Sequence, residues 1–316
     1  MKFKLIPLLS VLLLTSCSGN QLVLNDKIFC FATQVDITLY QGSNENIKDI
    51  KDILEKYDKL TDNYTPRGIN NVYAINQTND YVTIDNDLLD CIETAQDVTN
   101  QGAQYFNLLC GSLSKKWKES LLNGEILSQT VIEKELEKMN NTTLSFTTDS
   151  IKRDGEAEID LGGIAKGYAL DIVKNYLDEK GISQYLVNGG FSSILLGEKY
   201  NGDGNFIIKM KDLTNTYFKA KNCFVSTSSI SNQGVKIGET TYSHIINPIT
   251  GSAINENDAI IVISDSGYLG DALSTSMMMN TVEEIKQIEI EQNVKTIVIK
   301  NNSVIYSNKD IEVFNR

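Results

Sequence analysis

Histidine and proline are scarce in this sequence, which has one histidine and three prolines in 316 residues. A single histidine excludes a zinc site built from several histidines. Neither a Walker-type Gly-Lys-Ser/Thr loop nor a Gly-x-Gly-x-x-Gly fingerprint is present. Basic residues are also in deficit, with 29 against 41 acidic residues and a net charge of −12. This balance argues against nucleic acid as a partner, because phosphate backbones bind basic surfaces.

The cysteines are few and far apart. Apart from Cys17 they are Cys30, Cys91, Cys110 and Cys223, and no two form a Cys-x-x-Cys pair. This spacing indicates neither a metal cluster nor a thioredoxin-like motif. We expect buried free thiols in a chain of this length, although the sequence leaves disulfide pairing open.

The N-terminus has the features of a bacterial processing signal. Lys2 and Lys4 precede an apolar run from Leu5 to Leu14, which is too short to span a bilayer. The following Leu-Thr-Ser-Cys resembles a lipobox, in which Cys17 is acylated; an ordinary secretory signal is the alternative. We therefore expect a lipid-anchored protein on the extracytoplasmic face of the bacterial cell membrane. The expected parts are a signal peptide (1–16), a tether (17–25) and a functional domain (26–316).

Hydrophobic periodicity predicts an α+β fold, with mixed, largely antiparallel sheets and flanking helices, because the strands come in pairs separated by helices. The expected helices are 46–64, 85–101, 130–139, a helix from about 165 that ends at Gly181, 271–280 and 282–292. The expected strands are 28–40, 81–84, 185–187, 193–196, 206–210, 223–226, a hairpin over 235–246, 259–263, 294–299 and 303–306.

Two local predictions in the first half are more detailed. Thr130 and Glu133 have the spacing of a capping box, which predicts the start of a charged helix there. The segment 102–117 has no clear period, and we interpret it as irregular with one helical turn.

The stretch from Ile159 to Leu170 carries the strongest local signal. Gly162 and Gly163 are expected to let the backbone turn with positive φ, and Lys166 then lies at the start of a helix. Backbone N–H groups at such a turn, together with a lysine, form a site suited to phosphate groups. The alternative is a tight structural turn with an exposed lysine.

A second candidate is the pair Asp271 and Thr275. The two residues are four apart, so on a helix they lie on one face. A carboxylate and a hydroxyl are hard oxygen ligands that suit Mg²⁺ shared with phosphates. The alternative is an Asp N-cap followed by a Ser/Thr-rich first turn.

Two further stretches are less specific by themselves. His244 lies in a strand that ends in a Pro/Gly turn, and a lone histidine is commonly structural. Asn188-Gly189-Gly190 is compatible with a plain hairpin turn.

Taken together, these motifs resemble one family, the bacterial FAD:protein FMN transferases, also called the ApbE family. The resemblance covers most of the mature chain. It rests on four segments in family order: Asp160 to Gly167, Val187 to Gly190, Ser243 to Gly251 and Asp271 to Thr275. It implies an ApbE-like (T-fold-like) single large domain. It also implies transfer of FMN from FAD to a Ser or Thr hydroxyl of an acceptor flavoprotein, with release of AMP.

The resemblance also implies roles for individual positions. Mg²⁺ would bind the Gly163 carbonyl, Asp271 and Thr275. Lys166 would stabilise charge on the phosphates, and His244, expected near Asp271, would deprotonate the acceptor hydroxyl or orient the diphosphate. The positions that would contact FAD are Asp160, Lys166, Ile245, Phe31, Tyr64, Phe106, Asn107 and Leu108.

Two departures from the family pattern keep other functions open. Asn107 stands where the family usually has Asp, and Asn247 replaces the Asp of the common His-x-x-Asp-Pro. One alternative is therefore a non-catalytic flavin-binding or solute-binding lipoprotein. Another is an FAD pyrophosphatase, in which water replaces the acceptor hydroxyl and the products are FMN and AMP.

Overall fold

The computed structural model describes residues 23–211, 213–230, 234–254 and 257–316. The predicted signal peptide, Cys17 and most of the tether lie outside these residues. The first strand, β1 (Leu24–Cys30), begins one residue before the predicted end of the tether. In the described part of the chain, no helix is both long and apolar enough to cross a membrane.

The main sheet has eight strands in the order β1-β2-β6-β7-β10-β13-β14-β15, and each recorded pairing is antiparallel. The other strands of this sheet are β2 (Thr33–Leu39), β6 (Tyr185–Gly189), β7 (Ser193–Leu196), β10 (Cys223–Ser229), β13 (Ala259–Ser264), β14 (Lys295–Lys300) and β15 (Ser303–Ser307). The order places the hairpin β6–β7 in the middle of the sheet, between β2 and β10.

Three smaller sheets surround it, in the orders β3-β5-β4, β16-β9-β8 and β11-β12. Their strands are β3 (Val82–Thr83), β4 (Thr143–Phe146), β5 (Ser150–Asp154), β8 (Phe206–Lys209), β9 (Thr216–Ala220), β11 (Val235–Ile237), β12 (Thr240–Tyr242) and β16 (Val313–Asn315). Each is short, so packing against the rest of the protein must support it.

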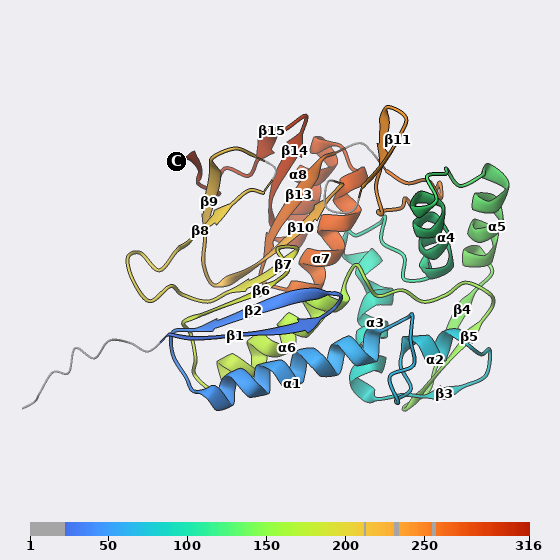
Figure 1. Ribbon diagram of the computed structural model, residues 1–316, viewed down its shortest axis with the longest axis horizontal. Coiled ribbons are helices and arrows are strands. Elements are labelled where there is room, and N and C mark those ends of the chain that lie inside the picture. Colours follow the sequence, from blue (N-terminus) through green and yellow to red (C-terminus); the bar gives the residue numbers. More distant parts are fainter. Residues whose placement is uncertain (1–22, 212, 231–233, 255–256) are drawn as a thin grey trace, which may run out of the picture.

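Helices cover one face of the main sheet and form a separate group at one edge of the molecule. They are α1 (Asn44–Thr61), α2 (Val72–Asn76), α3 (Asn86–Asp97), α4 (Gly111–Leu122), α5 (Gln129–Asn140), α6 (Ala165–Glu179), α7 (Gly267–Ser276) and α8 (Val282–Gln292), with 3₁₀ turns at Val98–Gln101 and Met277–Met279. Figure 1 shows α1 and α6 along the β1–β2–β6 end of the sheet and α7 beside β10, while α4 and α5 stand together at the far edge.

Apolar side chains explain this layering. The inward residues of α1, α6 and α7 join the buried faces of β2, β6 and β13 in one large core. The opposite face of β7, β10 and β14 packs against β8 and β9 in a second core. A third cluster joins α4 and α5 through Trp117 and Ile132 and extends to Ile246, two residues after the sole histidine. The α+β fold class predicted from the sequence is confirmed.

Several local predictions were wrong. The strand predicted over 28–40 is a hairpin, because Phe31 (φ 51°) and Ala32 (φ 55°) turn the chain in the left-handed region without glycine or asparagine. The predicted capping box is absent: α5 begins after Ser128, and the Thr130 hydroxyl makes no cap bond there. The segment predicted as mainly irregular contains α4, a helix of 12 residues.

The described cysteines are all free thiols. Burial raises the pKa of Cys30, Cys91, Cys110 and Cys223 to about 12, so these thiols stay protonated and unreactive at neutral pH.

Candidate active site

Asp271 is the polar centre of the candidate site. It lies in the middle of α7, whose N-cap is Ser266, so the alternative interpretation of Asp271 as an N-cap is wrong. Its side chain is buried. The carboxylate accepts hydrogen bonds from the Gly167 N–H (2.7 Å), the Ser226 hydroxyl (2.6 Å) and the Ser193 hydroxyl (2.8 and 2.9 Å). One carboxylate therefore joins α7 to α6, β10 and β7.

Two glycines allow α6 and α7 to approach closely. A Cβ on Gly167 would lie 2.1 Å from the Gly267 carbonyl oxygen, and one on Gly267 would lie 2.3 Å from the Gly167 oxygen. Asp171 of α6 strengthens this contact by accepting the N–H groups of Gly267 and Tyr268, both at 2.8 Å, at the start of α7. The backbone of α6 is thus fixed against the helix that carries Asp271.

The Asp271 contact satisfies one of the free N–H groups at the start of α6. Gly167 is the third residue of this helix, and the first N–H groups of a helix have no acceptor inside it. Here the Gly167 N–H donates to Asp271, and no hydrogen bond from the described residues reaches the Gly163 carbonyl. The Lys166 N–H likewise has no acceptor among the described residues. A free carbonyl and a free N–H therefore lie at the same helix end.

Gly162 and Gly163 do not have the positive φ that we predicted from the sequence. Their need for glycine is steric instead. A Cβ on Gly163 would lie 3.1 Å from the Phe106 ring and 3.7 Å from Thr275 Oγ1. A Cβ on Gly162 would lie 3.0 Å from Asp160 Oδ1, which accepts the Gly162 N–H at 2.8 Å. Gly163 is thereby brought next to Thr275, as a shared ligand would require.

The hydroxyl of Thr275 belongs to a small polar cluster. It donates to the Asp271 carbonyl at 3.2 Å and lies 3.2 Å from Ser228 Oγ, which in turn lies 3.0 Å from Ser274 Oγ. Among the described residues no group of three or more His, Cys, Asp or Glu side chains could hold a metal. A cation here would need mixed oxygen ligands, namely one carboxylate, one hydroxyl and one peptide carbonyl, and these suit Mg²⁺. One serine hydroxyl would have to turn away from Asp271 to admit it.

Lys166 supplies positive charge beside this carboxylate. Burial raises the pKa of Asp271, and the charge of Lys166 is the largest effect opposing the shift. In the described part of the chain no carboxylate lies within the 4.0 Å of an ion pair with the Lys166 ammonium. The half-buried ammonium is therefore free to bind an anion.

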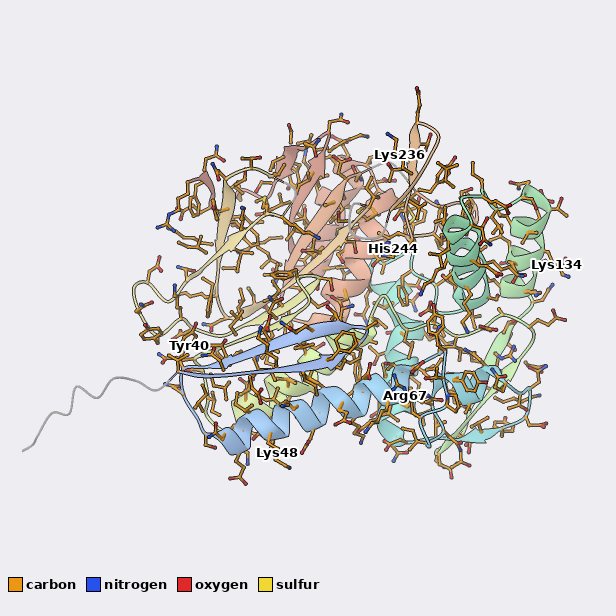
Figure 2. All side chains as sticks on the ribbon, in the orientation of Figure 1. Tyr40, Lys48, Arg67, Lys134, Lys236 and His244 are labelled. Atoms are coloured by element: carbon orange, nitrogen blue, oxygen red, sulfur yellow. The ribbon has the colours of Figure 1, made fainter. Side chains whose placement is uncertain are left out.

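His244 lies on a loop that α4 and α5 support. The Trp117 indole N–H donates to the Gly251 carbonyl at 2.7 Å, and the Trp117 ring stacks on Tyr242 with 6.3 Å between centroids. His244 itself is exposed. In the view of Figure 2 it lies between the ribbons of α7 and α4. Partial removal from water lowers the pKa of His244 below its ordinary value, and the positive charges of Lys166 and Lys118 lower it further.

The structure does not pair His244 with Asp271. No hydrogen bond or ion pair between these two side chains is found among the described residues, and the charges that act on His244 are those of lysines. Ile245, the next residue, is buried, so its side chain does not line an open surface. Any contact of Ile245 with a ligand would have to involve its backbone.

Asp160, Tyr64 and the predicted Phe106–Leu108 segment form the other side of the site. The Asp160 N–H donates to the Leu108 carbonyl at 2.8 Å. Burial raises the pKa of Asp160, and the positive charges of Lys115 and Lys118 oppose this rise. The Tyr64 ring, 51% exposed, lies 5.0 Å from each of these lysine ammonium groups.

Phe31 lies in the β1–β2 turn, and its N–H donates to Asp58 Oδ1 at 2.5 Å. The neighbouring Cys30 is close enough to Lys166 for the ammonium charge to lower the thiol pKa slightly against the effect of burial. The turn therefore lies at the Lys166 side of the site. The exposed Asn107 uses its side-chain oxygen to accept the Leu109 N–H at 2.9 Å.

Several contributing residues could not be recognised from the sequence. Ser193 and Ser226 are ordinary strand serines, and only the pairing of β7 with β10 brings both to Asp271. Lys118 and Trp117 lie in the helix that was not predicted. Asp171 had a usable signal, because it is a carboxylate on the glycine-rich face of a predicted helix.

Comparison with known proteins supports one family. The model of the ApbE family matches residues 31–298. An FAD:protein FMN transferase of Klebsiella pneumoniae is 26% identical over 72% of this chain and 73% of its own length. One of Buchnera aphidicola is 30% identical over 46% of this chain and 44% of its length. One of Rhodobacter capsulatus is 24% identical over 68% of this chain and 42% of its length, so two of these three matches span less than half of the relative.

Solved structures show the same fold. The ApbE protein of Thermotoga maritima superimposes with a TM-score of 0.78 at 20% identity, covering 91% of this chain and 97% of its own. A flavin transferase ApbE from Vibrio cholerae gives a TM-score of 0.72 at 19% identity, covering 93% and 96%. The likeness extends over nearly the whole of each chain.

Proposed function

Because this chain belongs to the ApbE family, we propose that it is a transferase that moves FMN from FAD to a Ser or Thr hydroxyl of an acceptor protein and releases AMP. The observation that carries the proposal is the bond from the Gly167 N–H to Asp271. Next to this bond, the Gly163 carbonyl and the Lys166 N–H have no partner among the described residues, and they lie at a helix N-terminus beside a lysine ammonium without an ion pair there. This combination suits a diphosphate and its counter-ion.

Lys166 is the residue that binds the diphosphate in this proposal. Its ammonium and its backbone N–H are both donors at the positive end of α6, where a negative charge is stabilised. As charge develops on the phosphate oxygens during transfer, the ammonium stabilises it in place, without reorganisation of solvent.

The residues that would hold Mg²⁺ are Gly163 through its carbonyl, Thr275 through its hydroxyl and Asp271 through its carboxylate. A bound Mg²⁺ would neutralise charge on the diphosphate oxygens. Ser193 and Ser226 keep the Asp271 carboxylate oriented before any ion binds, because each donates a hydrogen bond to it.

His244 is the proposed general base. Its lowered pKa leaves the imidazole neutral near pH 7, with a nitrogen lone pair available. The acceptor hydroxyl gives its proton to that nitrogen and its oxygen bonds to the FMN phosphorus. The bond from this phosphorus to the bridging oxygen then breaks, and AMP leaves. The exposure of His244 suits a protein acceptor, which must reach the site from outside.

The flavin dinucleotide would lie along the side formed by Tyr64, Phe106, Asn107, Leu108 and Asp160, with Phe31 and the Ile245 backbone at its ends. The exposed parts of this side are the Tyr64 ring and Asn107, whereas the Phe106 and Leu108 side chains are buried. An exposed aromatic face suits a flat conjugated ligand.

We further propose that Cys17 carries lipid and anchors the protein on the extracytoplasmic face of the membrane, where its acceptor would also be found. The support is the lipobox-like Leu-Thr-Ser-Cys after a short apolar run. Residues 18–22 then lie between the anchor and the first described residue, Val23. This length keeps the transferase close to the membrane surface.

One assay tests the proposal against its two alternatives. The protein is incubated with FAD and Mg²⁺, with and without a candidate acceptor, and AMP and acceptor-bound flavin are measured. We expect AMP only when the acceptor is present, in amounts equal to the flavin attached. AMP and free FMN without acceptor would instead identify a pyrophosphatase. Flavin binding with no AMP in either arm would identify a non-catalytic flavin protein.

A further inference from the structure

Two lysines of α4 lie against one aromatic ring of the candidate site. The ammonium groups of Lys115 and Lys118 are each 5.0 Å from the centroid of the Tyr64 ring. They are three residues apart, so they project from the same side of α4. A cation over an aromatic face is attracted by the ring, and this contact limits where each ammonium can lie.

The two lysines differ in whether a carboxylate pairs with them. Lys115 Nζ lies 2.7 Å from Glu158 Oε2 and donates to the Asn63 carbonyl at 2.9 Å. Lys118 is exposed, and it forms no ion pair within 4.0 Å in the described part of the chain. Only one of the two positive charges on this ring is therefore available to a ligand.

The free charge of Lys118 faces the centre of the site. It acts on the carboxyl group of Asp160 and on the imidazole of His244, and Lys166 acts on the same imidazole from α6. Two ammonium groups from different helices, neither with an ion pair in the described part of the chain, thus act on one histidine. In a chain of net charge −12, such a convergence concentrates positive potential where a small anion would enter.

We propose that Lys118 is a substrate-binding residue whose ammonium group pairs with the diphosphate of FAD opposite Lys166. This proposal rests on the proposed function, because it assigns a contact within the same FAD site. The Tyr64 ring holds the ammonium at 5.0 Å from its centroid, and Glu158 is already paired with Lys115, so no carboxylate in the described part of the chain forms an ion pair with Lys118. Lys118 would then discriminate between flavins with and without phosphate groups.

The test compares Lys118→Ala and Lys118→Arg with wild type in binding FAD, ADP and riboflavin. Lys118→Ala should weaken FAD and ADP binding about tenfold, as expected for the loss of one charged contact. Riboflavin, which has no phosphate, should bind unchanged, and Lys118→Arg should keep FAD affinity within about threefold of wild type. The matched control is Lys134→Ala, which removes the same charge from α5; Figure 2 shows Lys134 at the outer edge of the molecule, away from His244.

A second readout uses the fact that His244 is the only histidine, so a single imidazole signal reports the site by NMR. In the ligand-free protein, Lys118→Ala should raise the pKa of His244, because a positive charge that lowers it is removed. Lys134→Ala should leave that pKa unchanged. If the folded Lys118→Ala protein leaves the pKa of His244 unchanged, Lys118 does not face the site.

Three outcomes of the binding experiment have distinct meanings. Equal FAD affinity in Lys118→Ala and wild type would overturn the proposed contact. An equal loss for FAD and riboflavin would also overturn it, because Lys118 would then act on the flavin or on the fold. A wild-type protein that binds riboflavin and ADP but neither binds nor cleaves FAD would instead contradict the proposed function.

Discussion

Replacing Asp271 in two ways separates its chemical role from its structural one. In Asp271→Asn the side-chain oxygen can still accept the Gly167 N–H, and the new NH₂ group can donate to Ser226 or Ser193, whose hydroxyls rotate freely. The variant also removes an ionisable group that is buried. We therefore expect its free energy of unfolding to stay within about 1 kcal/mol of wild type.

In Asp271→Ala the same three donors lose their acceptor. The Gly167 N–H has no other acceptor in the described part of the chain, and a buried unpaired donor costs about 1–3 kcal/mol. The removed atoms leave a small void as well, so we expect a total loss of roughly 2–4 kcal/mol. For a chain of this size that is a fall in Tm of roughly 4–10 °C.

Both variants should lack FMN transfer, because neither has the charged oxygen ligand that the proposed Mg²⁺ site needs. The assay is AMP release against Mg²⁺ concentration, with Tm measured by calorimetry on the same samples. A well-folded Asp271→Asn protein that keeps Mg²⁺-dependent activity would refute the metal site. An Asp271→Ala protein as stable as wild type would refute the hydrogen-bond reasoning.

Three other predictions follow from individual contacts. Trp117→Phe loses the hydrogen bond to the Gly251 carbonyl and should lower the free energy of unfolding by about 1–3 kcal/mol. Because that bond holds the loop of His244, kcat in steady-state kinetics should fall, while FAD affinity measured by titration should stay the same. Burial raises the pKa of Asp171 to about 6, so the stability that this group contributes should be lost as pH rises from about 4 to about 6. Because burial raises the pKa of Asp160 and Asp271 as well, Asp171→Asn should show a smaller fall in Tm over this range than wild type. Cys17→Ala should move the protein out of the membrane fraction, and mass spectrometry of the wild type should find lipid on Cys17.

The elements that could be predicted are those whose signals are local. α6 carries a clear apolar period and ends at Glu179, with Lys180 as its C-cap and Gly181 following with φ 66°, as the sequence indicates. The strands predicted at 294–299 and 303–306 are found as β14 and β15, and the turn between them uses Asn301 and Asn302, both with positive φ. In each case the residue that sets the backbone conformation is visible in the sequence.

The failures occur where distant contacts override local preference. Phe31 and Ala32 give no turn signal, yet the pairing of β1 with β2 and the Asp58 bond to the Phe31 N–H hold them in the left-handed region. The helix α4 buries only a narrow row of side chains, Leu113, Trp117 and Leu121, and Trp117 fixes it by packing against residues more than 100 positions away. Such contacts cannot be read from a local window.

In the candidate site, too, features set by local spacing were predictable and features set by distant contacts were not. The spacing of Asp271 and Thr275 predicted a shared helical face, and they do lie one turn apart on α7. The spacing could not indicate that Asp271 would be held by residues from α6, β7 and β10. Nor could it indicate that the Gly163 carbonyl would lie beside Thr275 without a hydrogen-bond partner among the described residues.

The two residues that depart from the family pattern, Asn107 and Asn247, both accept hydrogen bonds within turns. Asn107 Oδ1 accepts the Leu109 N–H at 2.9 Å. Asn247 Oδ1 accepts the N–H groups of Ile249 at 2.9 Å and Thr250 at 3.1 Å. Each bond needs only an oxygen acceptor, which an asparagine amide supplies as well as a carboxylate does. Both turns therefore keep their shape without the negative charge. The non-catalytic alternative rested on these two residues; their hydrogen bonds show that the turns do not need the charge, and the AMP assay tests whether its loss affects FAD binding or catalysis.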